Sequence, residues 1–141
     1  MKVYEVRRTI AAPPERIWST LTDANALVSG GLGVARLDGE IKPGAKLKLW
    51  SEANPGRAFA LRVTEFTPAK RMVWAGGMPF GLFKGVRQYN LTPKGGGTEF
   101  HMREEFSGPM LALIGSSIPD LQPSFEKFAD GLRRLTEGKG A

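Results

Sequence analysis

The sequence has no cysteine and one histidine among its 141 residues. Without cysteine there can be no disulfide, no thiolate nucleophile and no sulfur-ligated metal. One histidine is too few for the histidine sets that hold zinc or non-haem iron. We therefore expect no metal and no cofactor. His101 lies on the face of its predicted strand opposite the apolar face, so we expect it to be a surface residue.

Long apolar runs are also missing, and a membrane-spanning helix needs about 20 such residues. The first residues lack the apolar core of a secretory signal, so we expect a cytoplasmic protein without an integral membrane segment. Acidic residues are fewer than basic ones, giving a net charge of +6. The basic residues are dispersed in short groups such as Arg7-Arg8 and Arg133-Arg134. This dispersion predicts a solvated basic surface and no nucleic-acid partner.

The hydrophobic pattern predicts one domain, residues 1–141, of mixed α+β class. Alternating segments indicate strands, and segments of helical spacing indicate two short helices after the first strand and one long helix at the end. Turns are expected at Lys42-Pro43-Gly44, at Asn54-Pro55-Gly56 and in the hairpin loop 94–97. The predicted order is strand 2–10, helices 14–22 and 23–29, strands 32–40, 45–51, 57–66, 71–75, 80–92 and 98–106, and a helix ending at residue 138.

The last helix carries an apolar stripe at helical spacing, formed by Leu121, Phe125, Phe128, Leu132 and Leu135. Asp120 or Ser117 is expected to cap its start. A long antiparallel sheet that buries one helix has to curl around it, which leaves a cavity between sheet and helix. The apolar run 110–114 is either a gate over the mouth of that cavity or ordinary packing beneath the helix.

Two charged residues fall on apolar strand faces. Arg87 lies on the same predicted face as Tyr89, and Glu104 lies on the same predicted face as Met102. Their strands are hairpin neighbours, and a buried Arg and Glu are tolerable as a pair. In the functional interpretation Arg87 holds a carboxylate or enolate, Glu104 acts as acid or base, and Tyr89 assists them. The alternative is a structural salt bridge. Trp74 and Tyr89 have polar tips that orient a ring-shaped ligand, or they are core residues.

These faces predict a ligand-binding set that combines apolar wall residues with the charged pair. Its members are Phe59, Leu61, Trp74, Phe83, Arg87, Tyr89, Phe100, Met102, Glu104, Phe125 and Phe128.

The order of several motifs resembles a known superfamily, and the motifs cover nearly the whole chain. They are IAAPPERIW (10–18), LTD (21–23), KPG (42–44), FALRVTEFTP (59–68), GT (97–98), EEFSG (104–108) and the Phe125, Phe128 and Leu132 stripe. In this order the chain resembles the START-like, or Bet v 1-like (SRPBCC), superfamily, and specifically its bacterial polyketide cyclase/dehydrase-type members. The resemblance implies the helix-grip fold, a seven-stranded antiparallel sheet curled around the C-terminal helix, with two short helices between strands 1 and 2 and a deep apolar cavity.

The resemblance does not imply one activity, because such folds host many functions. The leading hypothesis is a monomer or homodimer that binds a hydrophobic small molecule, of lipid, polyketide or aromatic type, in the cavity. The second is a cofactor-free polyketide cyclase or dehydratase that moves protons with Glu104, Arg87 or Tyr89. The third is a co-chaperone-like or adaptor protein that binds a partner through its outer sheet face, around Lys46, Lys48 and Trp50.

Overall fold

A seven-stranded antiparallel sheet dominates the computed structural model, which describes residues 2–52, 54–77, 79–114 and 120–138. The strands lie in the order β1-β7-β6-β5-β4-β3-β2, so the first strand of the chain, β1, pairs with the last, β7. The strands are β1 (Lys2–Ile10), β2 (Val34–Asp38), β3 (Lys46–Ser51), β4 (Asn54–Thr67), β5 (Arg71–Gly77), β6 (Lys84–Lys94) and β7 (Gly97–Ser107).

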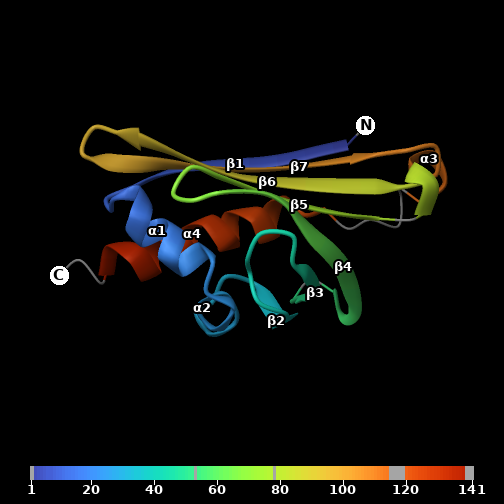
Figure 1. Ribbon diagram of the computed structural model, residues 1–141, viewed down its shortest axis with the longest axis horizontal. Coiled ribbons are helices and arrows are strands. Elements are labelled where there is room, and N and C mark those ends of the chain that lie inside the picture. Colours follow the sequence, from blue (N-terminus) through green and yellow to red (C-terminus); the bar gives the residue numbers. More distant parts are fainter. Residues whose placement is uncertain (1, 53, 78, 115–119, 139–141) are drawn as a thin grey trace.

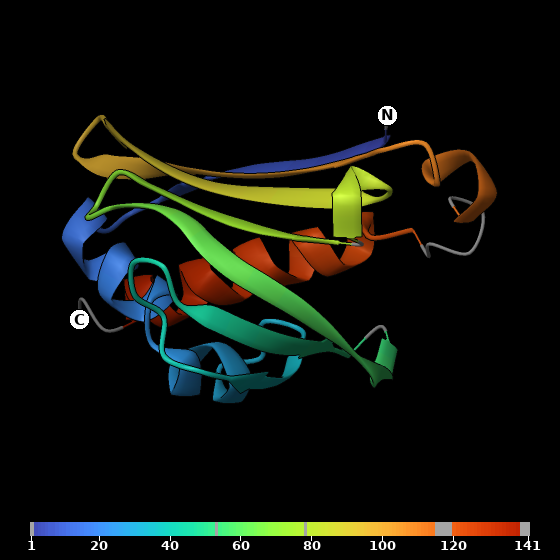
Figure 2. The ribbon, with the colours of Figure 1, turned by 45° about the vertical axis from the view of Figure 1, so that its right-hand side comes forward.

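The helices are α1 (Pro14–Leu21), α2 (Ala24–Ser29), α3 (Leu111–Ile114) and α4 (Gln122–Gly138). The sheet curls around α4, and α1 and α2 lie near the C-terminal half of α4 (Figures 1 and 2). Pro14 starts α1, where its missing N–H is harmless. Asp23 caps α2 by accepting from the backbone N–H groups of Asn25 and Ala26. Among the described residues, no helix is long and apolar enough to cross a membrane.

The core lies between the concave face of the sheet and α4. Alternate residues of β7, from Thr98 to Phe106, are buried, as the period of two requires. The α4 stripe supplies Phe125, Phe128 and Leu132, all buried. The predicted helix-grip architecture is therefore confirmed.

Two predicted element boundaries differ from the structure by three residues or more, and several others differ by one or two. The strand predicted from residue 80 begins at Lys84, because Pro79–Gly81 forms a short 3-10 turn with Phe80 at φ 61°. The predicted turn at residues 54–56 is the start of β4, where Ser51 pairs with Asn54. Proline is tolerated in the first residues of a strand, so Pro55 does not end the ladder. At the start of α4, Asp120 accepts from the N–H of Gln122 as expected for a cap; Ser117 lies outside the described residues.

Candidate functional site

A cavity of about 110 Å³ lies between the concave face of the sheet and α4. Its lining is mostly apolar, with Arg87 and Glu104 as the charged members. Phe59 lines the cavity and is 41% exposed, so it lies at the opening. The complete lining is Leu32, Gly33, Val34, Leu49, Ser51, Phe59, Leu61, Arg87, Met102, Glu104, Phe106, Leu121, Ser124, Phe125 and Phe128.

Arg87 and Glu104 form an ion pair on the cavity wall. They are direct partners in the β6–β7 ladder. Glu104 Oε1 accepts hydrogen bonds from Arg87 Nε at 3.0 Å and from Nη2 at 2.6 Å. Their side chains keep only 20% and 11% of their surface exposed. The guanidinium also lies over the Phe125 ring, 4.9 Å from its centroid.

The electrostatics of the pair favour a permanently charged guanidinium. Burial alone lowers the pKa of Arg87, but the Glu104 carboxylate and the Tyr89 hydroxyl raise it above its ordinary value. Arg87 therefore presents a fixed positive charge to the apolar cavity, with the Glu104 carboxylate beside it. Such a wall can orient the acidic or carbonyl end of a ligand, and the carboxylate can accept a proton.

Trp74 and Tyr89 are neighbours of Arg87 in the sheet: Trp74 is its partner on β5, and Tyr89 lies two residues further along β6. Their ring centroids are 5.0 Å apart. In the described residues, Trp74 Nε1 and Tyr89 Oη are buried without a hydrogen-bond partner of good geometry. Burial raises the pKa of Tyr89, and the nearby Arg87 charge lowers it by less. Neither side chain lines the cavity, so an acceptor atom can reach these donors only if neighbouring core side chains move. A buried polar group without a partner is costly.

The structure brings most of the predicted ligand-binding set together. Phe59, Leu61, Arg87, Met102, Glu104, Phe125 and Phe128 line the cavity. Trp74, Tyr89 and Phe100 are instead fully buried in the core, and Phe83 stacks on Phe106. The reason is that α4 covers the middle of the sheet, so inward side chains there pack against its aromatic stripe. The binding and catalytic roles of all these residues stay predictions.

Several lining residues were not predicted: Leu32, Gly33, Val34, Leu49, Ser51, Phe106, Leu121 and Ser124. Phe106 shares a face of β7 with Met102 and Glu104, so alternation carried a signal for it. Leu49 pairs with Phe59 across the β3–β4 ladder. Ser124 lies one turn before Phe128, where a small residue on an aromatic stripe leaves space. The segment 32–34 has no such signal, because only the tertiary fold brings it to the mouth.

The remaining candidates lie away from the cavity. His101 faces the other side of β7, where its Nε2 is 2.8 Å from Glu5 Oε1. In the run 110–114, Leu111 packs against the core, whereas Leu113 is 73% exposed. Trp50 is half-buried, with the Arg36 guanidinium 4.8 Å from its ring.

Solved structures with the same fold share little sequence with this chain. Protein MLL2253 from Mesorhizobium loti is 19% identical, with a TM-score of 0.73 over 95% of this chain and 96% of its own. The di-domain ARO/CYC StfQ from the steffimycin biosynthetic pathway is 14% identical, with a TM-score of 0.74 over 98% of this chain and 52% of its own. The Aha1 dimer from Colwellia psychrerythraea is 20% identical, with a TM-score of 0.72 over 97% of each chain.

Sequence comparison gives a broader match. The family described as polyketide cyclase / dehydrase and lipid transport matches residues 1–137. No curated protein matches this chain in sequence.

Proposed function

Because the chain belongs to the polyketide cyclase/dehydrase and lipid transport family, we propose that it binds a hydrophobic small molecule between the sheet and α4. The ligand has an apolar body and an acidic, enolic or carbonyl group. Apolar burial supplies the driving force, about 25 cal/mol per Å². Arg87 and Glu104 fix the orientation of the polar group.

The observation that carries this proposal is the ion pair on an otherwise apolar cavity wall. Most of the charged side chains of the sheet that form ion pairs do so at the surface, as Arg7 does with Glu99. Arg87 and Glu104 instead face inward and line the cavity. Charge in an apolar site is costly to bury, and a ligand that binds to it gains orientation from few polar contacts.

The size of the cavity requires movement on binding. Its volume of about 110 Å³ is below the roughly 150 Å³ of a cavity that accepts benzene. A lipid or polyketide ligand therefore has to displace side chains at the opening. Phe59 and Leu121 are suited to this, because both line the cavity and neither is fully buried.

The experiment is native mass spectrometry of protein purified from its own host, followed by organic extraction and a thermal-shift panel of lipids and polyaromatic acids. We expect a retained or stabilising hydrophobic molecule. Ser124→Phe fills the cavity and should abolish the response. Ser19→Phe on the exposed side of α1 is the matched control and should keep it. An empty protein that no ligand stabilises would overturn the proposal.

A second candidate is a cofactor-free cyclase or dehydratase acting in the same cavity. The observation that favours it is the group formed by the Glu104 carboxylate, the Arg87 guanidinium and the buried Tyr89 hydroxyl. Glu104 would take a proton from an activated carbon, and Arg87 would stabilise the resulting enolate. If Glu104→Gln keeps ligand affinity but abolishes turnover of a poly-β-carbonyl compound, the protein is an enzyme. If the original protein binds such a compound without turning it over, it is a carrier.

A further inference from the structure

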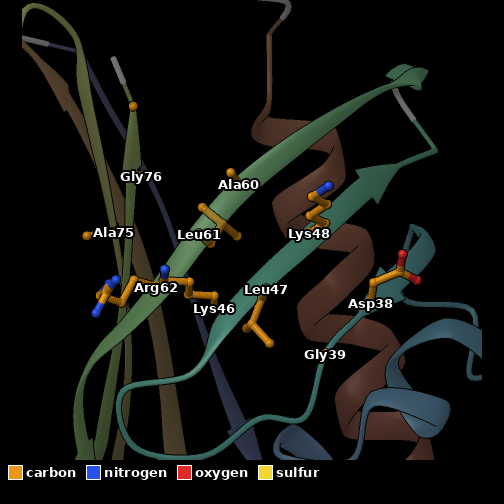
Figure 3. Close-up of a pocket in the computed structure, with 11 residues that line it drawn as sticks. Asp38, Gly39, Lys46, Leu47, Lys48, Ala60, Leu61, Arg62, Ala75 and Gly76 are labelled. Atoms are coloured by element: carbon orange, nitrogen blue, oxygen red, sulfur yellow. The ribbon is translucent and has the colours of Figure 1, made fainter. Parts of the chain in front are cut away.

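A second hollow lies on the opposite, outer face of the sheet. It has a volume of about 610 Å³ and is formed by β2, β3, β4 and β5 (Figure 3). We call it the outer groove: Lys46, Lys48, Arg62 and Asp38 are its charged residues, and Ala60 and Ala75 belong to its floor. It is shallow and open, so a ligand that lies in it stays partly exposed to solvent. The inner cavity, at about 110 Å³, is much smaller.

The outer groove places like charges side by side. Lys46 and Arg62 are direct partners in the β3–β4 ladder, and Figure 3 shows their side chains next to each other. Lys48 follows on the same face of β3. Like charges at opposed positions of neighbouring strands are destabilising. The fold thus keeps an arrangement that stability alone disfavours.

These three cations also lack the ion-pair partners that several other basic residues of the sheet have. Within the described residues, none of the three makes an ion pair or a side-chain hydrogen bond. By contrast, Arg71 pairs with Glu65 and Arg103 pairs with Glu105. The acidic residue of the outer groove is Asp38, and Arg36 binds both of its carboxylate oxygens, at 2.9 and 3.1 Å.

The floor between the cations is small and uncharged. It consists of Ala60 on β4 with Ala75, Gly76 and Gly77 on β5. Outer strand positions usually carry larger β-branched or polar side chains. Here their absence leaves a shallow hollow, with Lys46, Lys48 and Arg62 around it, that a flat or compact molecule can occupy.

We propose that the outer groove binds a soluble small molecule that carries a phosphate or diphosphate group. The phosphate oxygens lie between Lys46 and Arg62, where Arg62 offers a planar fork of donors and Lys46 a compact charge. The rest of the ligand lies over Ala60 and Ala75. This site is on the other side of the sheet from the inner cavity, so it does not depend on the function proposed for that cavity.

The test is a titration of the ¹⁵N-labelled protein with sodium pyrophosphate at low ionic strength, compared with sodium chloride at the same ionic strength. We expect pyrophosphate to shift the backbone amide signals of Lys46, Arg62 and Ala75. Binding should weaken as salt is raised, because the site is exposed. Absence of shifts in the outer groove, or binding to phosphatidylglycerol vesicles without binding to pyrophosphate, would overturn the proposal.

Variants make the test sharper. Arg62→Gln should weaken pyrophosphate binding about fivefold or more. Lys70→Gln, which removes an exposed charge at the β4–β5 turn, should leave it unchanged. Arg62→Gln should also raise the melting temperature, by about 2 °C, because it relieves repulsion with Lys46. Weaker binding in a more stable protein excludes unfolding as the cause, whereas equal binding by the two variants would refute the site.

Discussion

Glu104 Oε1 accepts two hydrogen bonds from Arg87, at 3.0 and 2.6 Å, across the β6–β7 ladder. The pair places both signs of charge at one point of an apolar cavity. The Phe125 ring of α4 packs against the same guanidinium. The pair therefore joins two strands and the helix, and it fixes where the polar end of a ligand can lie.

Loss of one member of this pair should be more harmful than loss of both. Glu104→Leu leaves a largely buried guanidinium uncompensated and should lower the free energy of unfolding by about 2 kcal/mol. This is below the range for fully buried pairs because both side chains keep some exposure. The double variant Arg87→Met/Glu104→Leu should fall within about 1 kcal/mol of the original protein. Urea denaturation measures both, and additive losses would contradict the account.

Tyr89→Phe should preserve or increase stability. The Tyr89 hydroxyl is buried without a hydrogen-bond partner of good geometry among the described residues, so its removal relieves a desolvation penalty. We expect a gain of up to about 1 kcal/mol in the free energy of unfolding. The loss of stability at alkaline pH should also change. Burial raises the pKa of Tyr89, so the native state holds its proton longer than the unfolded state, and stability falls as pH rises above 10.

That alkaline loss should be smaller in Tyr89→Phe than in the original protein, as measured by urea midpoints at several pH values. A clear loss of stability at neutral pH would instead show that the hydroxyl has a favourable partner.

Gly76→Ala should be strongly destabilising. A Cβ at this position would clash with the backbone oxygen of Ala60, which cannot move without opening the β4–β5 ladder. We expect a loss of about 2–4 kcal/mol. Gly56→Ala is the matched control in β4, because a Cβ there meets nothing within 4 Å. It should leave the melting temperature nearly unchanged. Similar melting curves for the two variants would show that β5 tolerates a shift here.

Acid should weaken the contact between β1 and β7. A hydrogen bond with His101 is the main reason why the pKa of Glu5 lies below its ordinary value of 4.5. A carboxyl group with a lowered pKa stabilises the native state above that value, and the contribution disappears as pH falls through the native pKa. His101→Gln should therefore raise the pKa of Glu5, measured by carboxyl ¹³C titration. An unchanged pKa of Glu5 in His101→Gln would contradict this account.

Much of the inner site could be predicted from the sequence, because strand alternation and a hairpin loop fix relative positions. Arg87 and Glu104 lie on apolar faces of consecutive strands, and the loop at 94–97 sets their register. The α4 stripe likewise predicts which residues face the sheet. The ends of the strands were harder to predict. Phe80 lies outside β6 because Gly77 and Gly81, both at positive φ, turn the chain there.

The sequence by itself determined the order of elements, their buried faces and the curl of the sheet around α4, since these follow from local periodicity and the need to bury one apolar stripe. The tertiary structure alone decided which inward aromatics fill the core and which line the cavity, because that depends on where α4 crosses the sheet. It also decided that Lys46 meets Arg62, 16 residues away along the chain, because the register of β3 with β4 depends on the whole sheet.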